Sequence, residues 1–473
     1  MANEIKQRKL KKYSIEEKTK IVTTFRDQIR NIYDPEKCIK SVQSIIKSLL
    51  STQGYINLEI SKFVSPYMIG EALIRLNRNS SRGLDEIDIY HRMKKGIRVC
   101  RAISKRVQNG KYSPSPYKII EFVKDPSDPS RTRKIGIFST TEKVIQTLLK
   151  CILEPIYEPE FLSNSFAYRP GKSPQKAFEW LSEGLKSGDY KYCIKIDIKK
   201  YFDSIDHEPL LRILEEKVKS PEILSYIEEF LKSSKLEKYQ FIENSRGTPQ
   251  GSVLGPLLSN IYLHEILDKP VKDNFPEILF VRFADDIIFF SKSKEETFKL
   301  LRFVTVNLKK YNLGISDKIR KLLFDLEKDE IHFLGYTISK TDKGIQITPN
   351  EMRIIERCEK YLNIFYETIS TYKDDSVIDL REYKQEEIPV SVRNINIFYL
   401  IDRFKSSIQL YRNQYSDESN ILTNKLEEVK LELKTLLFNN ITDRKRIWDV
   451  IHYYENRMGL GTSKREEKQV VIT

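Results

Sequence analysis

The sequence predicts an α+β fold in which a core with an antiparallel sheet is flanked by helical regions. Apolar residues in the first hundred positions recur at the spacing of helices with one buried face. Short runs rich in β-branched and aromatic residues begin at Tyr117 and include two strongly apolar segments, 192–198 and 278–291. After Pro349 the strand signals fade and long helical patterns return. We therefore predict three regions: a helical extension (1–114), a mixed core (115–345) and a helical C-terminal region (346–473).

Local signals in the first two regions support this division. Ser14, followed by Glu17, is typical of a helix N-terminus, and residues 6–12 form a basic arm. The runs 118–123 and 134–138 predict a hairpin around a turn at 125–131. The remaining predicted elements are a helix capped by Ser139 or Thr140, helices at 257–267 and 295–311, a hairpin of 331–339 with 345–348, helices at 350–371, 391–415 and 419–438, and a polar linker at 374–388.

Charge and cysteine content narrow the functional class. The chain has 81 basic and 67 acidic residues, a net charge of +14, which favours a nucleic acid partner but also fits a merely basic soluble protein. The five cysteines are dispersed in sequence, which excludes a zinc site of paired cysteines and predicts a reducing, cytoplasmic location. The basic N-terminus is not a signal peptide, and no apolar stretch approaches the ~20 residues of a membrane span.

Three aspartates are the candidate catalytic residues. Asp197 ends one predicted strand, and Asp285 and Asp286 lie between two apolar arms. An Asp-Asp pair between strands is usually only a turn, but these flanks are too apolar for an exposed loop. We expect a hairpin with both carboxylates at its turn, beside Asp197 on the neighbouring strand. Phosphoryl transfer to a nucleotide needs two divalent ions held by hard oxygen ligands, and three carboxylates suit that chemistry.

Other motifs offer contacts to a nucleotide or a template. Phe202 follows Asp197 closely and either packs under a sugar, where it would exclude a 2′-hydroxyl, or serves as ordinary core. The segment 246–252 is a glycine-rich loop that opens a helix, where backbone can approach a base closely. Basic residues in two turns suit phosphate contacts, although isolated basic turns are more often solvated surface: Arg133, Lys134 and Arg169.

These motifs together resemble the reverse transcriptases of bacteria, of the group II intron type. The resemblance covers about residues 115–345 and departs from the family in Phe138, where proline is usual, and in Phe283, where tyrosine is commoner. The matching blocks stand in the family's order: Arg133–Phe138, Tyr168–Ser173, Asp197–His207, Gly247–Gly251, Phe283–Asp286 and Phe333–Gly335.

The resemblance implies a right-hand polymerase of fingers, palm and thumb, with fingers and palm in 115–345 and the thumb in 346–473. It implies two Mg²⁺ ions, with Mn²⁺ as the alternative, bound by Asp197, Asp285 and Asp286 with help from the backbone of Ile198. It implies nucleotide contacts from Arg133, Lys134, Arg169, Phe202, Gln250 and either Lys318 or Lys321. Template and primer contacts are implied for Gly247, Pro249, Gly251 and the primer grip Phe333, Leu334 and Gly335.

The function that follows is RNA-directed DNA synthesis from dNTPs, with an RNA template and a DNA product as partners. The sequence has no His/Cys-rich endonuclease tail and no recognisable maturase signature, so the pattern resembles domesticated, defence-associated enzymes of the anti-phage or abortive-infection type. Such an enzyme is expected to copy a dedicated non-coding RNA, as an oligomer or with a partner protein. The alternatives are untemplated or protein-primed synthesis, and a maturase-like protein that binds intron RNA.

Overall fold

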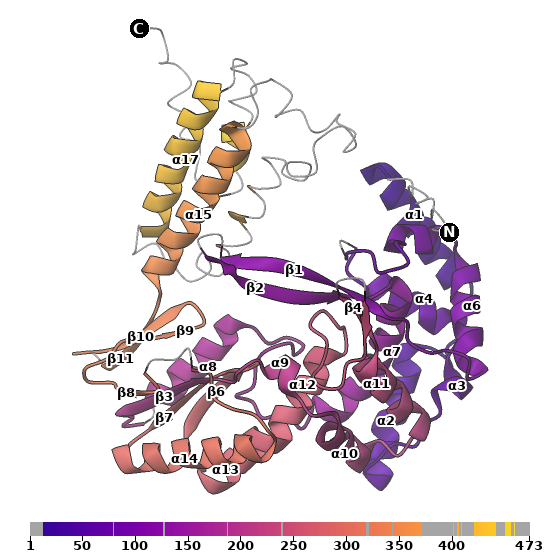
Figure 1. The fold of residues 1–473 in the computed structure, drawn as a ribbon, viewed down its shortest axis with the longest axis horizontal. Coiled ribbons are helices and arrows are strands. Elements are labelled where there is room, and N and C mark those ends of the chain that lie inside the picture. The colour runs from indigo at the N-terminus through magenta and orange to yellow at the C-terminus, as the bar shows by residue number, and fades with distance from the viewer. Residues whose placement is uncertain are drawn as a thin grey trace. The chain divides into compact units, whose positions relative to one another are not determined.

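The structure is a computed structural model in which two compact units, Met1–Leu326 and Glu327–Thr473, are defined (Figure 1). It describes residues 13–370 except for 79, 126–127, 187, 238–239, 318–320 and 343, and beyond them residues 421–440, 450–455, 401, 404, 405, 408 and 458. The predicted basic arm at 6–12, the linker at 374–388, most of the helix at 391–415 and Lys318 lie outside the described residues. The division into three regions stays a prediction.

Six helices open the first unit: α1 (Ile15–Arg30), α2 (Ile39–Gln53), α3 (Ile60–Phe63), α4 (Pro66–Arg75), α5 (Ile89–Lys94) and α6 (Ile97–Gln108). The predicted cap of α1 is confirmed, because the Ser14 side chain accepts from Glu17 N and Glu17 bonds back to Ser14 N. Apolar residues of these helices share one hydrophobic core with the central sheet and the helices that follow it. The N-terminal helices are therefore packed into the body of the unit.

A four-stranded sheet of order β2-β1-β4-β5 contains the predicted hairpin. Strands β1 (Tyr117–Asp125) and β2 (Asp128–Ile137) pair antiparallel and extend further toward their turn than the sequence predicted. The short strands β4 (Lys235–Glu237) and β5 (Gln240–Ile242) complete the sheet. Ser139 caps the next helix, α7 (Thr140–Tyr157), as one of the two predicted candidates. This helix is buried along most of its length.

The central sheet has the order β6-β7-β3-β8 and carries the three aspartates. Its strands are β3 (Tyr192–Asp197), β6 (Leu279–Phe283), β7 (Asp286–Ser291) and β8 (Leu323–Asp325). Helix α8 (Pro174–Lys186) contacts β6, and α14 (Lys294–Lys310) contacts β3 and β7, on opposite faces of the sheet in Figure 1. The other elements are α9 (Tyr201–Ser204), α10 (His207–Lys217), α11 (Pro221–Lys232), α12 (Gly255–Leu263), a π-helical turn η1 (His264–Asp268) and α13 (Lys269–Asn274). The helix predicted at 257–267 is thus α12 followed by the π-helical turn.

In its described residues, the second unit contains a three-stranded antiparallel sheet of order β11-β10-β9 and the long helices α15 and α17. The strand predicted at 331–339 is two strands, β9 (Ile331–Phe333) and β10 (Tyr336–Thr341), because Leu334 and Gly335 form a turn with positive φ. β11 (Gly344–Pro349), α15 (Glu351–Ser370) and α17 (Ile421–Asn440) agree with the predicted elements. Leu422, Leu426, Val429 and Leu433 of α17 are buried in a separate core, as their spacing predicts. Of the helices in the described part of the chain, none could span a bilayer.

Candidate active site

The structure brings Asp197, Asp285 and Asp286 together at one end of the central sheet. β3 and β7 pair antiparallel with Asp197 opposite Asp286, and β6 pairs with β7 so that Ala284 and Asp285 form the hairpin turn. The Ile198 backbone N–H donates to the Asp285 carbonyl at 3.3 Å, which ties the chain after β3 to the turn. The expected hairpin beside Asp197 is therefore confirmed.

The turn itself holds an unusual backbone conformation. Ala284 has φ +59° and is nearly buried. A residue with a Cβ rarely adopts this conformation, and the cost is of order 1–3 kcal/mol unless the surroundings impose it. Such strain collects at sites where side chains must be aimed for function. Here it falls at the residue directly before Asp285.

Among the three aspartates, Asp285 has surroundings that disfavour its charged form. Burial raises its pKa to about 6, and the carboxylates of Asp197 and Asp286 add to the rise, while Arg133 opposes it. Several carboxylates in one partly desolvated place cannot all ionise without a compensating cation. The chemistry of this donor set therefore suits a hard divalent ion.

The arrangement is not a closed metal cage. Among the described residues, no group of three or more His, Cys, Asp or Glu side chains is arranged to hold an ion. Mg²⁺ is usually bound by one or two carboxylates together with substrate phosphates and water, rather than by protein ligands alone. The three carboxylates fit that kind of site, in which a bound nucleotide completes the ligands.

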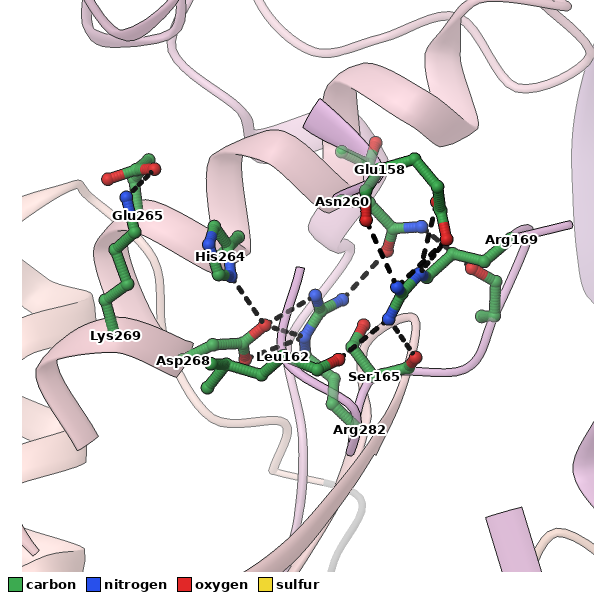
Figure 2. A network of polar contacts seen from close by, with 12 residues as sticks. Glu158, Leu162, Ser165, Arg169, Asn260, His264, Glu265, Asp268, Lys269 and Arg282 are labelled. Carbon is green, nitrogen blue, oxygen red and sulfur yellow. Dashed lines mark hydrogen bonds and ion pairs between the residues drawn. The ribbon is translucent and has the colours of Figure 1, made fainter. Parts of the chain in front are cut away.

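A buried ion pair, drawn in Figure 2, contacts the hairpin turn through Arg282. Arg282 of β6 and Asp268 of η1 are both fully buried, and the Arg282 guanidinium donates to both Asp268 oxygens at 2.7–2.9 Å. Arg282 Nη1 also donates to Asn260 Oδ1 at 2.9 Å and to the Ala284 carbonyl at 3.5 Å. Burial disfavours the charged form of Asp268, but Arg282 and His264 outweigh it and lower the pKa of that carboxyl. The charged pair thus supports the strained turn from inside the protein.

The sequence interpretation missed this network, although an arginine within an apolar strand was a visible signal. Its partners are Asn260 of α12 and Asp268 of η1. The polar residues of this helical segment have no spacing in the sequence that predicts a shared partner. Their pairing with Arg282 depends on tertiary structure alone.

Arg169, a predicted nucleotide contact, is buried in a local polar network. Its side chain is only 6% exposed, and it forms an ion pair with Glu158 at 2.9 Å. Its Nη1 donates to the carbonyls of Leu162 at 2.8 Å and Ser165 at 2.6 Å, as Figure 2 shows. With its guanidinium committed in this way, Arg169 acts as a structural residue that holds its own loop.

The loop of Gly247 to Gly251 is held tightly against two neighbouring segments. Gly247 has φ +84°, and an added Cβ would meet the backbone of Phe202 and Asp203 at 2.7 Å. Thr248 N donates to the Phe202 carbonyl at 2.7 Å, and Gly136 N of β2 donates to the Gln250 carbonyl at 2.6 Å. The glycines are required here because backbones approach each other too closely for a side chain.

Gln146 anchors the far end of the same loop. It is fully buried on α7, and its Oε1 accepts from Ser252 Oγ and from Val253 N, both at 2.8 Å. Beside the loop lies a cavity of about 200 Å³, whose lining includes Tyr117, Asp203 and Arg246. The loop is therefore fixed by hydrogen bonds to Phe202, to β2 and to Gln146.

Gly251→Ala is expected to destabilise the protein and weaken nucleotide use. Gly251 has φ +100°, and its Cβ would lie 2.2 Å from the Gly136 carbonyl oxygen, so β2 must move away. We expect a loss of about 2 kcal/mol or more in urea unfolding and a higher KM for dNTP. Gly54→Ala is the matched control, since Gly54 has φ +77° with nothing within 4 Å of its Cβ. Equal losses in both variants would contradict the clash.

The other predicted site residues have different contacts in the structure. Arg133 Nε donates to Gln250 Oε1 at 2.9 Å, so these two side chains meet. Phe202 is half-buried on α9, next to the loop. Lys134 pairs with Glu237, which raises its pKa, and Lys321 lies over the Phe324 ring. Phe333, Leu334 and Gly335 belong to the second unit, and their role in gripping a primer stays a prediction.

Comparison with known proteins agrees with these motifs. Residues 123–338 match the family described as reverse transcriptase (RNA-dependent DNA polymerase). The group II intron-encoded protein LtrA of Lactococcus lactis subsp. cremoris is 38% identical over 169 residues, which are 36% of this chain and 27% of that protein. A 91 kDa protein in the cob intron of Schizosaccharomyces pombe is 37% identical over 134 residues, 28% of this chain and 16% of that one. The chain thus spans far less than two thirds of these relatives.

Two further comparisons are more distant. Protein YkfC of Escherichia coli is 24% identical over 280 residues, which cover 52% of this chain and 72% of that one. A structure of telomerase from Candida albicans aligns with a TM-score of 0.37 at 13% identity, over 74% of this chain and 64% of that one, which is too weak to support a conclusion. The family match and the intron-encoded homologues agree with each other. Residues 123–338 therefore form a reverse transcriptase domain with homologues among intron-encoded proteins, one of which is encoded by a group II intron.

Proposed function

We propose that this domain catalyses RNA-directed DNA synthesis, adding dNTPs to a 3′-hydroxyl paired with an RNA template. The observation that carries the proposal is the meeting of Asp197, Asp285 and Asp286 at the ends of β3 and β7, inside the region that matches the family. The raised pKa of Asp285 supports it, because a cluster of this kind needs a cation to become fully ionised.

Each group near the aspartates has a task in this proposal. The three carboxylates, with help from the backbone of Ile198, would hold two Mg²⁺ ions, or Mn²⁺. Bound ions of this type supply positive charge that activates the attacking hydroxyl and neutralises the phosphates. Arg133 and Gln250, which already contact each other, orient the incoming nucleotide. The loop of Gly247, Pro249 and Gly251, held against Phe202 and β2, contacts the template strand.

Phe202→Ala is expected to increase incorporation of rNTPs. In the proposed arrangement the Phe202 ring packs under the sugar and leaves no space for a 2′-hydroxyl. Removing it should lower the ratio of kcat/KM for dCTP over CTP by about a hundredfold, while DNA synthesis continues. Single-nucleotide extension of a DNA primer on an RNA template measures both values. An unchanged ratio would show that Phe202 is ordinary core.

A second candidate function is binding of intron RNA in splicing, and the similarity to intron-encoded proteins favours it. The net charge of +14 suits binding to RNA in either function. Three carboxylates facing phosphates would weaken binding in the absence of metal, which argues for catalysis as the main role. The two functions differ in whether the carboxylates are needed.

The biological setting that we propose is anti-phage defence, with a dedicated non-coding RNA as template and a partner protein or further copies of the chain. Its support is the resemblance of the sequence to defence-associated reverse transcriptases. The experiment is to purify the protein from its native host, as wild type and as Asp285→Ala/Asp286→Ala, and to sequence the nucleic acid bound to each. One abundant small RNA in both, with complementary DNA only in the wild type, is the expected result.

Other outcomes of that experiment count against the proposal in different ways. DNA without a complementary RNA would favour untemplated or protein-primed synthesis. Intron RNA in both samples, with DNA in neither, would favour the splicing function.

A further inference from the structure

Tyr168 combines two features that are unusual for a large aromatic residue. The residue is 54% exposed, and its backbone has φ +59°. Non-glycine residues in this region cost of order 1–3 kcal/mol, so the surroundings must impose the conformation. Backbone strain of this kind collects at functional sites, so an exposed ring on a strained residue is a candidate functional side chain.

The buried polar network clamps the chain on both sides of Tyr168. On one side the Ala167 carbonyl accepts from Asn260 Nδ2 at 2.7 Å, and Asn260 is held in turn by Arg282. On the other side Arg169 is buried in its contacts with Glu158 and with the Ser165 carbonyl (Figure 2). Because both neighbours point inward and are held there, Tyr168 must lie between them with its ring outward.

The outward ring packs on the proposed sugar-contacting residue. The centroids of the Tyr168 and Phe202 rings are 6.2 Å apart and their planes are 85° apart, an edge-to-face pair. Phe202 also packs edge-to-face on Tyr201 at 5.6 Å, and the fully buried Tyr201 donates to the Ser259 carbonyl at 2.6 Å. Phe202 thus lies between one ring that is anchored in the core and one ring that is exposed.

We propose that Tyr168 is a specificity-determining residue that holds the Phe202 ring in place for selection of 2′-deoxyribose over ribose. This inference rests on the proposed function, in which Phe202 contacts the sugar of the incoming nucleotide. Tyr168 acts through Phe202 and is a positioning residue. The Tyr168 ring packs on one side of the Phe202 ring, and the phenolic oxygen is not needed for that contact.

The test compares Tyr168→Leu, which removes the ring, with Tyr168→Phe, which keeps it. Both replacements carry a Cβ, so the backbone strain is the same as in the wild type. The ratio of kcat/KM for dCTP over CTP should fall roughly two- to tenfold in Tyr168→Leu, the worth of one aromatic pair, and stay unchanged in Tyr168→Phe. Phe298→Leu, at a ring that is 53% exposed on α14, should leave the ratio unchanged.

A double variant separates action through Phe202 from a direct effect. Once Phe202 is Ala, Tyr168→Leu should lower the ratio no further. The inference is overturned if Tyr168→Leu lowers kcat/KM equally for dCTP and CTP, if it leaves the ratio unchanged, or if the two substitutions add. A wild-type protein that incorporates neither nucleotide overturns the proposed function itself, which is a different result from active enzyme with an unchanged ratio.

Discussion

Asp285→Asn is expected to abolish DNA synthesis and, at the same time, to make the metal-free protein more stable above pH 6. Loss of activity should reach about a thousandfold, since a group of this kind stabilises charge only when ionised. The gain in stability follows from the raised pKa. Between the ordinary value of 3.8 and the folded value of about 6, the native state binds more protons than the unfolded chain, so stability falls as pH rises through this range.

The cost of the ionised carboxylate is fully present above pH 6, and Asn removes it. We expect on the order of 1–2 kcal/mol of added stability at pH 7.5 in EDTA, and little difference from the wild type at pH 4.5. Thermal unfolding at the two pH values measures it. Mg²⁺ should stabilise the wild type more than the variant. Asp273→Asn, on the exposed end of α13, is the control and should change neither activity nor stability.

A less stable Asp285→Asn protein at pH 7.5 would contradict this account. It would mean that the carboxylate is already compensated by protein groups, with no need for a cation. Activity that persists in the variant would contradict the catalytic assignment directly.

Arg282→Met is expected to cause the largest loss of stability. Asp268 would be left as a fully buried, unpaired carboxylate, which costs roughly 3–5 kcal/mol. Adding Asp268→Leu should recover most of that loss, because a buried ion pair and a well-packed apolar pair are often of similar stability. Urea unfolding of the wild type, both single variants and the double variant measures these differences.

Activity should not recover with stability in the double variant. Arg282 also contacts Asn260 and the Ala284 carbonyl, and the apolar pair cannot replace those contacts. We therefore expect the double variant to fold and to extend a primer at least tenfold more slowly than the wild type. Full activity in a folded double variant would show that the ion pair contributes only to stability and that its contact with the hairpin turn is not needed for activity.

The sequence was most informative where chemistry is carried by short local motifs. The apolar arms around Asp285 and Asp286 predicted a hairpin, and β6 and β7 form it beside Asp197. Gly247 and Gly251 were predicted to let backbone approach a base or a template, which stays a prediction. The structure shows that both have positive φ and lie against the protein's own backbone, at Phe202 and Asp203 and at Gly136. In these cases a few neighbouring residues determine the local geometry.

Side-chain contacts that follow no regular spacing could not be predicted in this way. Arg169 looked like a basic surface turn, but the Glu158 carboxylate and two carbonyls hold it inside the protein. Asp268 pairs with Arg282 of another element, and Gln146 bonds to Ser252, 106 residues later in the chain. Tyr168, the residue before the predicted arginine, is the one whose ring packs on Phe202.

The most direct test of the central claim is primer extension by the purified protein on a defined RNA template. The reaction contains a DNA primer, all four dNTPs and Mg²⁺, and it is run with wild type and with Asp285→Asn. The account predicts full-length complementary DNA from the wild type, none from the variant, and none when EDTA replaces Mg²⁺. Equal extension by wild type and variant, or none by a folded wild type with either Mg²⁺ or Mn²⁺, would contradict it.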